Sequence, residues 1–228
     1  MGRNFTILFS FFISLSMSLS AQTAEQILPN VTNALAEQHW EEASNLFRLA
    51  VDKDLYKSEK YFQEQVSASC PARTEMIHQL GFYCKGSRDY EKAYVYYKEL
   101  VQLRPREIIY LVSCAELEVI LGKENDALKS YEKILSMDSN NLAANIFIGN
   151  YYYFTADKEK RMLDNEFKKT EAPTRMQYAN YRNELSRLVA NQYEKAKTFL
   201  EKVISQFPSV EAKKTLDKIR AVEEESRR

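Results

Sequence analysis

Helix-breaking residues and cysteine are scarce in this chain of 228 residues, which has five glycines, five prolines and three cysteines. With alanine, glutamate, lysine and leucine common, so few breakers favour helices over a turn-rich β fold. Three cysteines are also too few for a disulfide scaffold. For Cys84 and Cys114 two alternatives stay open, which are a bridge between them or buried free thiols on apolar helical faces.

The chain also lacks the motifs that carry catalysis. Its two histidines, His39 and His78, lie far apart, and its cysteines do not follow the C-x2-C spacing of a metal site. It has no glycine-rich phosphate loop and no nucleophile motif. Acidic residues are interspersed with lysine and arginine, as on solvated helix surfaces. We therefore predict no catalytic residue, no metal ligand, no cofactor and no enzymatic activity.

A strong charge of either sign is absent too, since the formal net charge is zero. The composition therefore indicates no attraction to nucleic acid or to anionic lipid. The one long apolar run lies in MGRNFTILFSFFISLSMSLSAQ, where one arginine precedes it and small residues follow. This layout predicts a secretory signal peptide over residues 1–20, with a retained membrane anchor as the alternative. We expect an exported mature chain with no stable membrane span, in the periplasm or at the surface of a bacterium.

Two stretches of the chain repeat one pattern, RDYEKAYVYYKELVQLRP at 88–105 and NQYEKAKTFLEKVISQFP at 191–208. Shifting the sequence by 34 residues aligns Ala93 with Ala127, and a period near 34 indicates helical-hairpin repeats. The best copy reads Ile77-x2-Leu80-Gly81-x2-Cys84, then Ala93-x3-Tyr97, then Pro105. These residues resemble the tetratricopeptide repeat, whose pattern is W-x2-L-G-x2-Y, then A-x3-F, then P.

The resemblance implies an all-α, right-handed solenoid of helical hairpins, with an elongated last hairpin and a C-terminal capping helix. We expect one domain over residues 21–228. Its repeats would lie at about 24–55, 74–107, 108–141 and 142–208, with the cap at 209–228. Small residues, Gly81 with Ala93 and Gly149 with Ala196, would let the paired helices approach closely.

Two insertions interrupt the period. The first, Tyr56 to Arg73, either lengthens a helix or adds a short one. The second leaves two interpretations of residues 156–190, a degenerate extra repeat or a last hairpin of long helices that turns at Pro173. We favour the long hairpin, because its return helix carries a mainly apolar seam at coiled-coil spacing. The seam residues are Tyr178, Tyr181, Leu185, Leu188, Gln192, Ala196, Phe199 and Val203.

In tetratricopeptide arrays the first helices line a concave groove, and the resemblance implies one here. The predicted groove residues are His78, Phe82, Lys85, Ile109, Val112, Glu116, Val119, Ile120, Ile146, Asn150, Tyr153 and Phe154. This mainly apolar set suits a partner segment or helix and does not match the family's carboxylate clamp. Alternatively, the chain's own inserted helices or its first repeat fill the groove. We expect a non-catalytic scaffold that binds another protein or peptide outside the cytosol. The alternatives are self-association and, less favoured, a ligand-binding or enzymatic site in the long hairpin.

Overall fold

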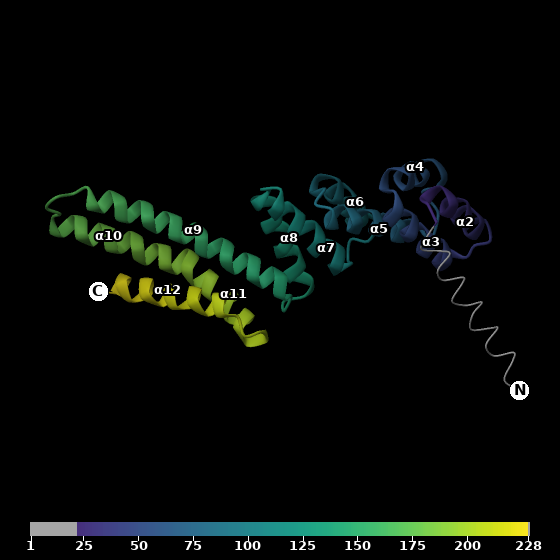
Figure 1. Cartoon of the computed structure of the whole chain (residues 1–228). Coiled ribbons are helices and arrows are strands. Elements are labelled where there is room, and N and C mark those ends of the chain that lie inside the picture. Colours follow the sequence, from purple (N-terminus) through teal and green to yellow (C-terminus); the bar gives the residue numbers. More distant parts are fainter. Residues whose placement is uncertain (1–21, 228) are drawn as a thin grey trace, which may run out of the picture. The chain divides into compact units, whose positions relative to one another are not determined.

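A computed structural model describes residues 22–227, and the predicted signal peptide therefore lies outside the described residues. The helices cluster into two compact units that divide between Pro105 and Arg106 (Figure 1). Each unit is described separately below. One continuous array across both units stays a prediction.

The N-terminal unit consists of two helical hairpins with a helix inserted between them. Its elements are α2 (Ala24–Ala36), α3 (Trp40–Lys53), α4 (Leu55–Gln65), α5 (Arg73–Gly86) and α6 (Tyr90–Leu103). Helix α2 packs on α3, and α5 packs on α6. Ala93, which was predicted to lie at a helix contact, is fully buried, and so is Ala43 of α3. A Cβ atom on Gly81 would lie 3.2 Å from Tyr96 and Tyr97 of α6, so that the predicted close approach of α5 and α6 is present.

Three hairpin turns share one backbone conformation. Gln38, Arg88 and Gly122 each follow the first helix of a hairpin and have φ of 62°, 66° and 70°. A residue in this left-handed region ends a helix and turns the chain back. Glycine adopts it without strain, whereas a residue with a Cβ atom pays a conformational cost there. In the second hairpin the left-handed residue is Arg88, which lies two residues after Gly86, the last residue of α5.

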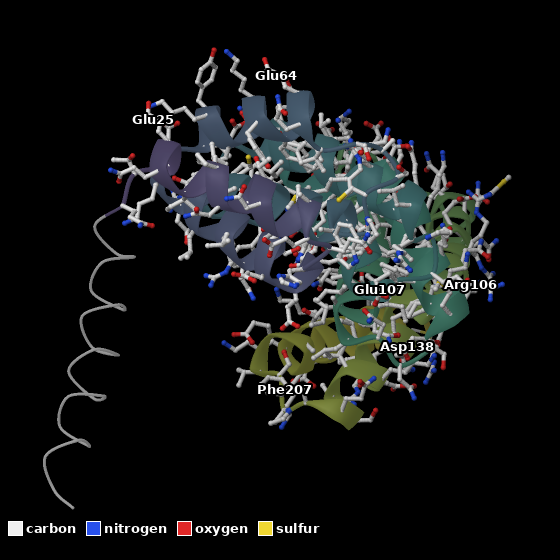
Figure 2. The ribbon with its side chains drawn as sticks, turned by 90° about the vertical axis from the view of Figure 1, so that its right-hand side faces the viewer. Glu25, Glu64, Arg106, Glu107, Asp138 and Phe207 are labelled. Atoms are coloured by element: carbon white, nitrogen blue, oxygen red, sulfur yellow. The ribbon has the colours of Figure 1, made fainter. Side chains whose placement is uncertain are left out.

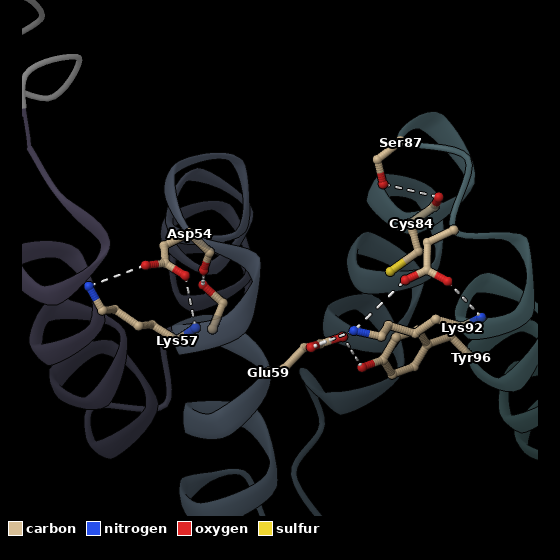
Figure 3. A network of polar contacts seen from close by, with 9 residues as sticks. Asp54, Lys57, Glu59, Cys84, Ser87, Lys92 and Tyr96 are labelled. Carbon is tan, nitrogen blue, oxygen red and sulfur yellow. Dashed lines mark hydrogen bonds and ion pairs between the residues drawn. The ribbon is translucent and has the colours of Figure 1, made fainter.

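The first insertion forms the separate helix α4. Asp54 caps this helix by accepting a hydrogen bond from the backbone N–H of Lys57 at 3.1 Å. Lys57 in turn pairs with Glu25 of α2, with 2.7 Å between Nζ and Oε1. On the other side of α4, the Glu59 carboxylate accepts hydrogen bonds from Lys92 at 3.1 Å and from Tyr96 at 2.8 Å (Figure 3). These contacts fix α4 to helices of both hairpins.

The C-terminal unit contains one short hairpin, one long hairpin and a final helix. The short hairpin is α7 (Ile108–Ile120) with α8 (Glu124–Met137). The long hairpin is α9 (Leu142–Lys168), which returns through α10 (Arg175–Leu188), the π-helix η1 (Val189–Tyr193) and α11 (Glu194–Gln206). Helix α12 (Val210–Arg227) packs on α10 and α11 (Figure 1). The all-α, tetratricopeptide-like fold class with an elongated last hairpin and a capping helix is confirmed, and an extra repeat at 156–190 is not formed.

The seam predicted along the return helix is correct at four of its eight positions. Leu185, Leu188, Ala196 and Val203 are buried as predicted. Of the other four, Tyr178 is exposed, whereas Tyr181, Gln192 and Phe199 are only partly buried. The residues that follow Gln192 and Phe199, which are Tyr193 and Leu200, fill the core instead. Tyr193 lies in η1, and a π-helical turn contains one residue more than an α-helical turn, which moves the buried position there from Gln192 to Tyr193.

Helix α12 covers the long hairpin. Ser209 caps it by accepting a hydrogen bond from the N–H of Ala212 at 3.1 Å. Leu216 and Ile219 are buried against the hairpin, whereas Val210 at the start of the helix is exposed. Polar contacts surround this buried interface, including an ion pair between Lys197 of α11 and Glu223 of α12 at 2.9 Å. The helix therefore has a structural role in closing the hairpin core.

Cys70, Cys84 and Cys114 form no disulfide, and Cys84 and Cys114 are buried. Of the two alternatives, a Cys84–Cys114 bridge or buried thiols, the structure therefore shows buried thiols. Burial, and next the nearby carboxylate of Glu59, raises the pKa of Cys84 to about 11. Because the thiolate is the reactive form, such a thiol is inert at neutral pH.

Candidate partner-binding surface

The exposed face of α7 is apolar. One side of this helix, with Leu111, Cys114 and Ala115, is buried. The other side presents Ile109, Val119 and Ile120, which are exposed, and Val112 and Glu116, which are partly exposed. All five are predicted groove residues. Isolated exposed apolar side chains are ordinary, but several on one helix face are typical of an interaction surface.

Helix α9 carries a second set at a spacing of four. Ile146 and Phe154 are exposed, the latter by 65%, and Asn150 between them is partly exposed. Since residues four apart share one helix face, these side chains form a stripe. Tyr153 is a correction. It is only 7% exposed and belongs to the core, where its ring meets that of Tyr193 at 6.2 Å.

The stripe continues beyond the residues that the sequence indicated. Met162 is exposed, and together with Phe154 and Lys218 of α12 it lines a cavity of about 450 Å³. The same spacing of four, extended from Phe154 through Lys158, reaches Met162, so this residue was accessible from the sequence. Lys218 was not, because its position depends on how α12 packs.

The other three predicted groove residues lie on α5 in the N-terminal unit. Phe82 is 68% exposed, so no described segment covers it. His78 is partly buried, with its ring 6.4 Å from Phe82 and 6.2 Å from Tyr97. Lys85 is partly exposed. Helix α4 therefore does not fill the surface around Phe82. A single groove that joins α5 to α7 and α9 stays a prediction.

A further cavity of the N-terminal unit lies between α2 and α4 and measures about 550 Å³. Glu25 of α2 and Glu64 of α4 are among its lining residues, and both are labelled in Figure 2. Its wall contains Tyr61, whose hydroxyl group is 2.9 Å from that of Thr32. No residue of this cavity was predicted as a site, because the placement of α4 could not be read from the sequence.

The groups with shifted pKa values have structural partners. Burial raises the pKa of Tyr153, and a hydrogen bond from Lys92 to Glu59 raises the pKa of this lysine. Burial, then hydrogen bonds to Asp164 and Glu225, raises the pKa of Tyr181. Within residues 22–227, no three His, Cys, Asp or Glu side chains are arranged to hold a metal ion. In the same range, no helix has the length and apolar character needed to cross a bilayer.

These features define a class, a helical-hairpin repeat protein with apolar side chains on its first helices. A family model described as tetratricopeptide repeat matches residues 74–107. The crystal structure of a candidate protein-binding protein from Bacteroides ovatus ATCC 8483 is 43% identical, with a TM-score of 0.82. That match covers 90% of this chain and 100% of the other. The chain belongs to the tetratricopeptide repeat family, whose fold is in general a scaffold for protein–protein interaction.

Solved structures of lower similarity also match. A tetratricopeptide repeat protein from Parabacteroides merdae ATCC 43184 is 15% identical, with a TM-score of 0.40 over 87% of this chain and 73% of that one. PilF of Pseudomonas aeruginosa is 14% identical, with a TM-score of 0.37 over 87% of this chain and 96% of that one. No curated protein matches the sequence.

Proposed function

We propose that this protein is an exported, non-catalytic scaffold that binds an apolar segment or amphipathic helix of another protein. The observation that carries the proposal is the set of exposed apolar side chains on first helices, with Phe82, Phe154 and Ile109 as its most exposed members. An amphipathic helix docks by inserting apolar anchors at a spacing of three or four residues, which is the spacing of the residues on α7 and α9.

The size of the surface sets a lower limit on the partner. Fully burying one large apolar side chain stabilises a complex by about 1.5–3 kcal/mol. Ile109, Ile120 and Phe154 are each about half exposed or more, so their burial together contributes roughly 3–5 kcal/mol. That alone corresponds to about millimolar affinity, before the entropy cost of association. A specific partner must therefore also cover neighbours such as Val119 and Ile146.

The test is crosslinking of the mature protein in its native envelope fraction, followed by identification of the partners by mass spectrometry. We compare Phe154→Glu with Met176→Glu, a matched control in the same unit, since Met176 is 68% exposed on α10. Both variants should fold, because both side chains face solvent. Partner recovery should fall at least tenfold for Phe154→Glu alone. Equal recovery from the two variants would refute the proposed surface.

Export and self-association need separate measurements. Export is supported by the apolar N-terminal pattern of residues 1–20. Cell fractionation that recovers the full-length chain in the cytosol would exclude it. Self-association through the same exposed residues would appear in light scattering as a mass that rises with concentration, and Phe154→Glu should abolish that rise. A constant monomer mass would exclude self-association.

A further inference from the structure

The cavity between α9 and α12 combines apolar and basic side chains. Phe154 and Met162 of α9 line it, and both are exposed. Its charged lining residues are Asp157, Lys158, Arg161 and Lys218. Three of these four groups are positive and one is negative. The cavity therefore carries an excess of two positive charges beside an apolar surface.

The excess charge belongs to two lysines. The carboxylate of Asp157 pairs with Arg161, with 2.9 Å between Oδ2 and Nη2. Lys158 and Lys218 are exposed and form no ion pair within residues 22–227. Ion pairs along a helix join residues three or four apart, and no residue at that distance from either lysine is acidic. Both ammonium groups are therefore available to a carboxylate of another molecule.

The position of Lys158 links its charge to the apolar surface. Exposed lysines without a partner are ordinary, and charge alone would indicate nothing. Phe154, Lys158 and Met162 follow one another at a spacing of four, so the lysine lies between the two apolar side chains on one helix face. A molecule that covers both apolar side chains also removes water from the ammonium group between them.

That loss of water selects the chemistry of the occupant. Removing a charged group from water is unfavourable unless the charge is paired. The long stem of a lysine can lie along apolar surface while its ammonium group reaches a carboxylate at the border. A purely apolar occupant supplies no such carboxylate, and a basic one is repelled. Charge complementarity therefore favours an occupant that has acidic residues beside its apolar anchors.

We propose that the partner segment docking on α9 is an acidic amphipathic helix, with Asp or Glu side chains that face Lys158 and Lys218. The inference rests on the proposed function, and it adds the charge of the partner and a contact with α12. Phe154 and Met162 lie about 12 Å apart along α9 at 1.5 Å per residue. About two turns of a partner helix therefore span this part of the surface.

The test compares three helical peptides of 14 residues in fluorescence anisotropy with the purified mature protein. Each peptide has leucine at spacings of three and four, alanine on the opposite face, and glutamate, glutamine or lysine beside the leucines. We expect saturable binding of the glutamate peptide, at least fivefold weaker binding of the glutamine peptide and still weaker binding of the lysine peptide. The preference should shrink between about 0.1 and 1 M salt, because the Debye length falls from about 10 to about 3 Å.

Charge reversal on the protein separates the two lysines from general electrostatics. The double variant Lys158→Glu with Lys218→Glu should bind the lysine peptide more tightly than the glutamate peptide, and loss of folding cannot produce such a reversal. The matched control is Lys133→Glu with Lys213→Glu. It changes the charge equally on α8 and α12 at exposed residues outside the cavity, and it should keep the original preference.

The outcomes distinguish this inference from the proposed function. Equal binding of all three peptides that Phe154→Glu abolishes would overturn the acidic partner and leave the apolar surface standing. An unchanged preference in the double variant, or no saturable binding of any peptide, would also overturn the inference, whereas the crosslinking comparison decides the proposed function. Vesicles of phosphatidylglycerol are the remaining probe. Binding to these vesicles that requires the two lysines, without binding of the glutamate peptide, would assign the lysines to lipid headgroups and refute the protein partner.

Discussion

Replacing Gly149 by alanine tests whether helix α9 approaches α11 as closely as the repeat pattern requires. A Cβ atom on Gly149 would lie 2.9 Å from Cγ and 3.0 Å from Cδ2 of Leu200, and 3.4 Å from its backbone nitrogen. Leu200 is almost completely buried in the core of the long hairpin. Its side chain therefore has little space to move away, and the backbone contact limits separation of the helices.

Two effects of opposite sign determine how much Gly149→Ala changes the free energy of unfolding. Alanine is favoured over glycine within a helix by about 1 kcal/mol. Overpacking a well-packed core costs about 1–3 kcal/mol. Gly149→Ala should therefore reduce the free energy of unfolding by roughly 0–2 kcal/mol. Gly86→Ala is the matched control, since a Cβ atom there meets nothing within 4 Å. It should stabilise the protein by up to about 1 kcal/mol.

Urea unfolding followed by far-UV circular dichroism measures both variants. A second experiment adds Leu200→Ala, which alone should lower the free energy of unfolding by about 2–5 kcal/mol. In the double variant, the methyl group that replaces the Gly149 hydrogen occupies space that the Leu200 side chain vacates, so the two changes together should cost less than their sum. If Gly149→Ala stabilises the protein as much as Gly86→Ala does, and the two changes are additive, the close contact is not what selects glycine.

Two further predictions follow from the hairpin turns and the buried thiol. Gln38→Gly and Arg88→Gly should each stabilise the protein by about 1 kcal/mol in the same urea assay, because both residues have positive φ, whereas Gly122→Ala should destabilise it by a similar amount. A loss of stability in both glycine variants would contradict this. At pH 8 a thiol reagent should modify the partly exposed Cys70 and spare Cys84 until the protein unfolds. Because the pKa of Cys84 is raised from 9.0 to about 11, its contribution to stability should be lost as pH rises from about 9 to 11. Cys84→Ala should flatten that part of the pH profile, and an unchanged profile would count against the raised pKa.

The candidate surface shows which of its residues a repeat pattern predicts correctly from the sequence. Phe82, Ile109 and Phe154 were indicated by their places on the first helices, and all three side chains are exposed. Tyr153 was misplaced, because one helical position separates the stripe from the core and the motif does not resolve that difference. The aromatic ring of Tyr193 takes part in burying it, and no motif position pointed to that residue.

Period and composition by themselves favoured the all-α class and the helix-contact glycines and alanines, and the apolar spacing of the return helix favoured the long last hairpin over an extra repeat. These depend on local rules, since helix propensity and a spacing of three or four residues act within one element. The buried oxygen of Gln79, the Glu59 contacts of α4 and the burial of Tyr193 in place of Gln192 at η1 were decided by tertiary structure alone. Each of them joins residues from different helices or depends on a local change of helical pitch, for which a spacing pattern carries no information.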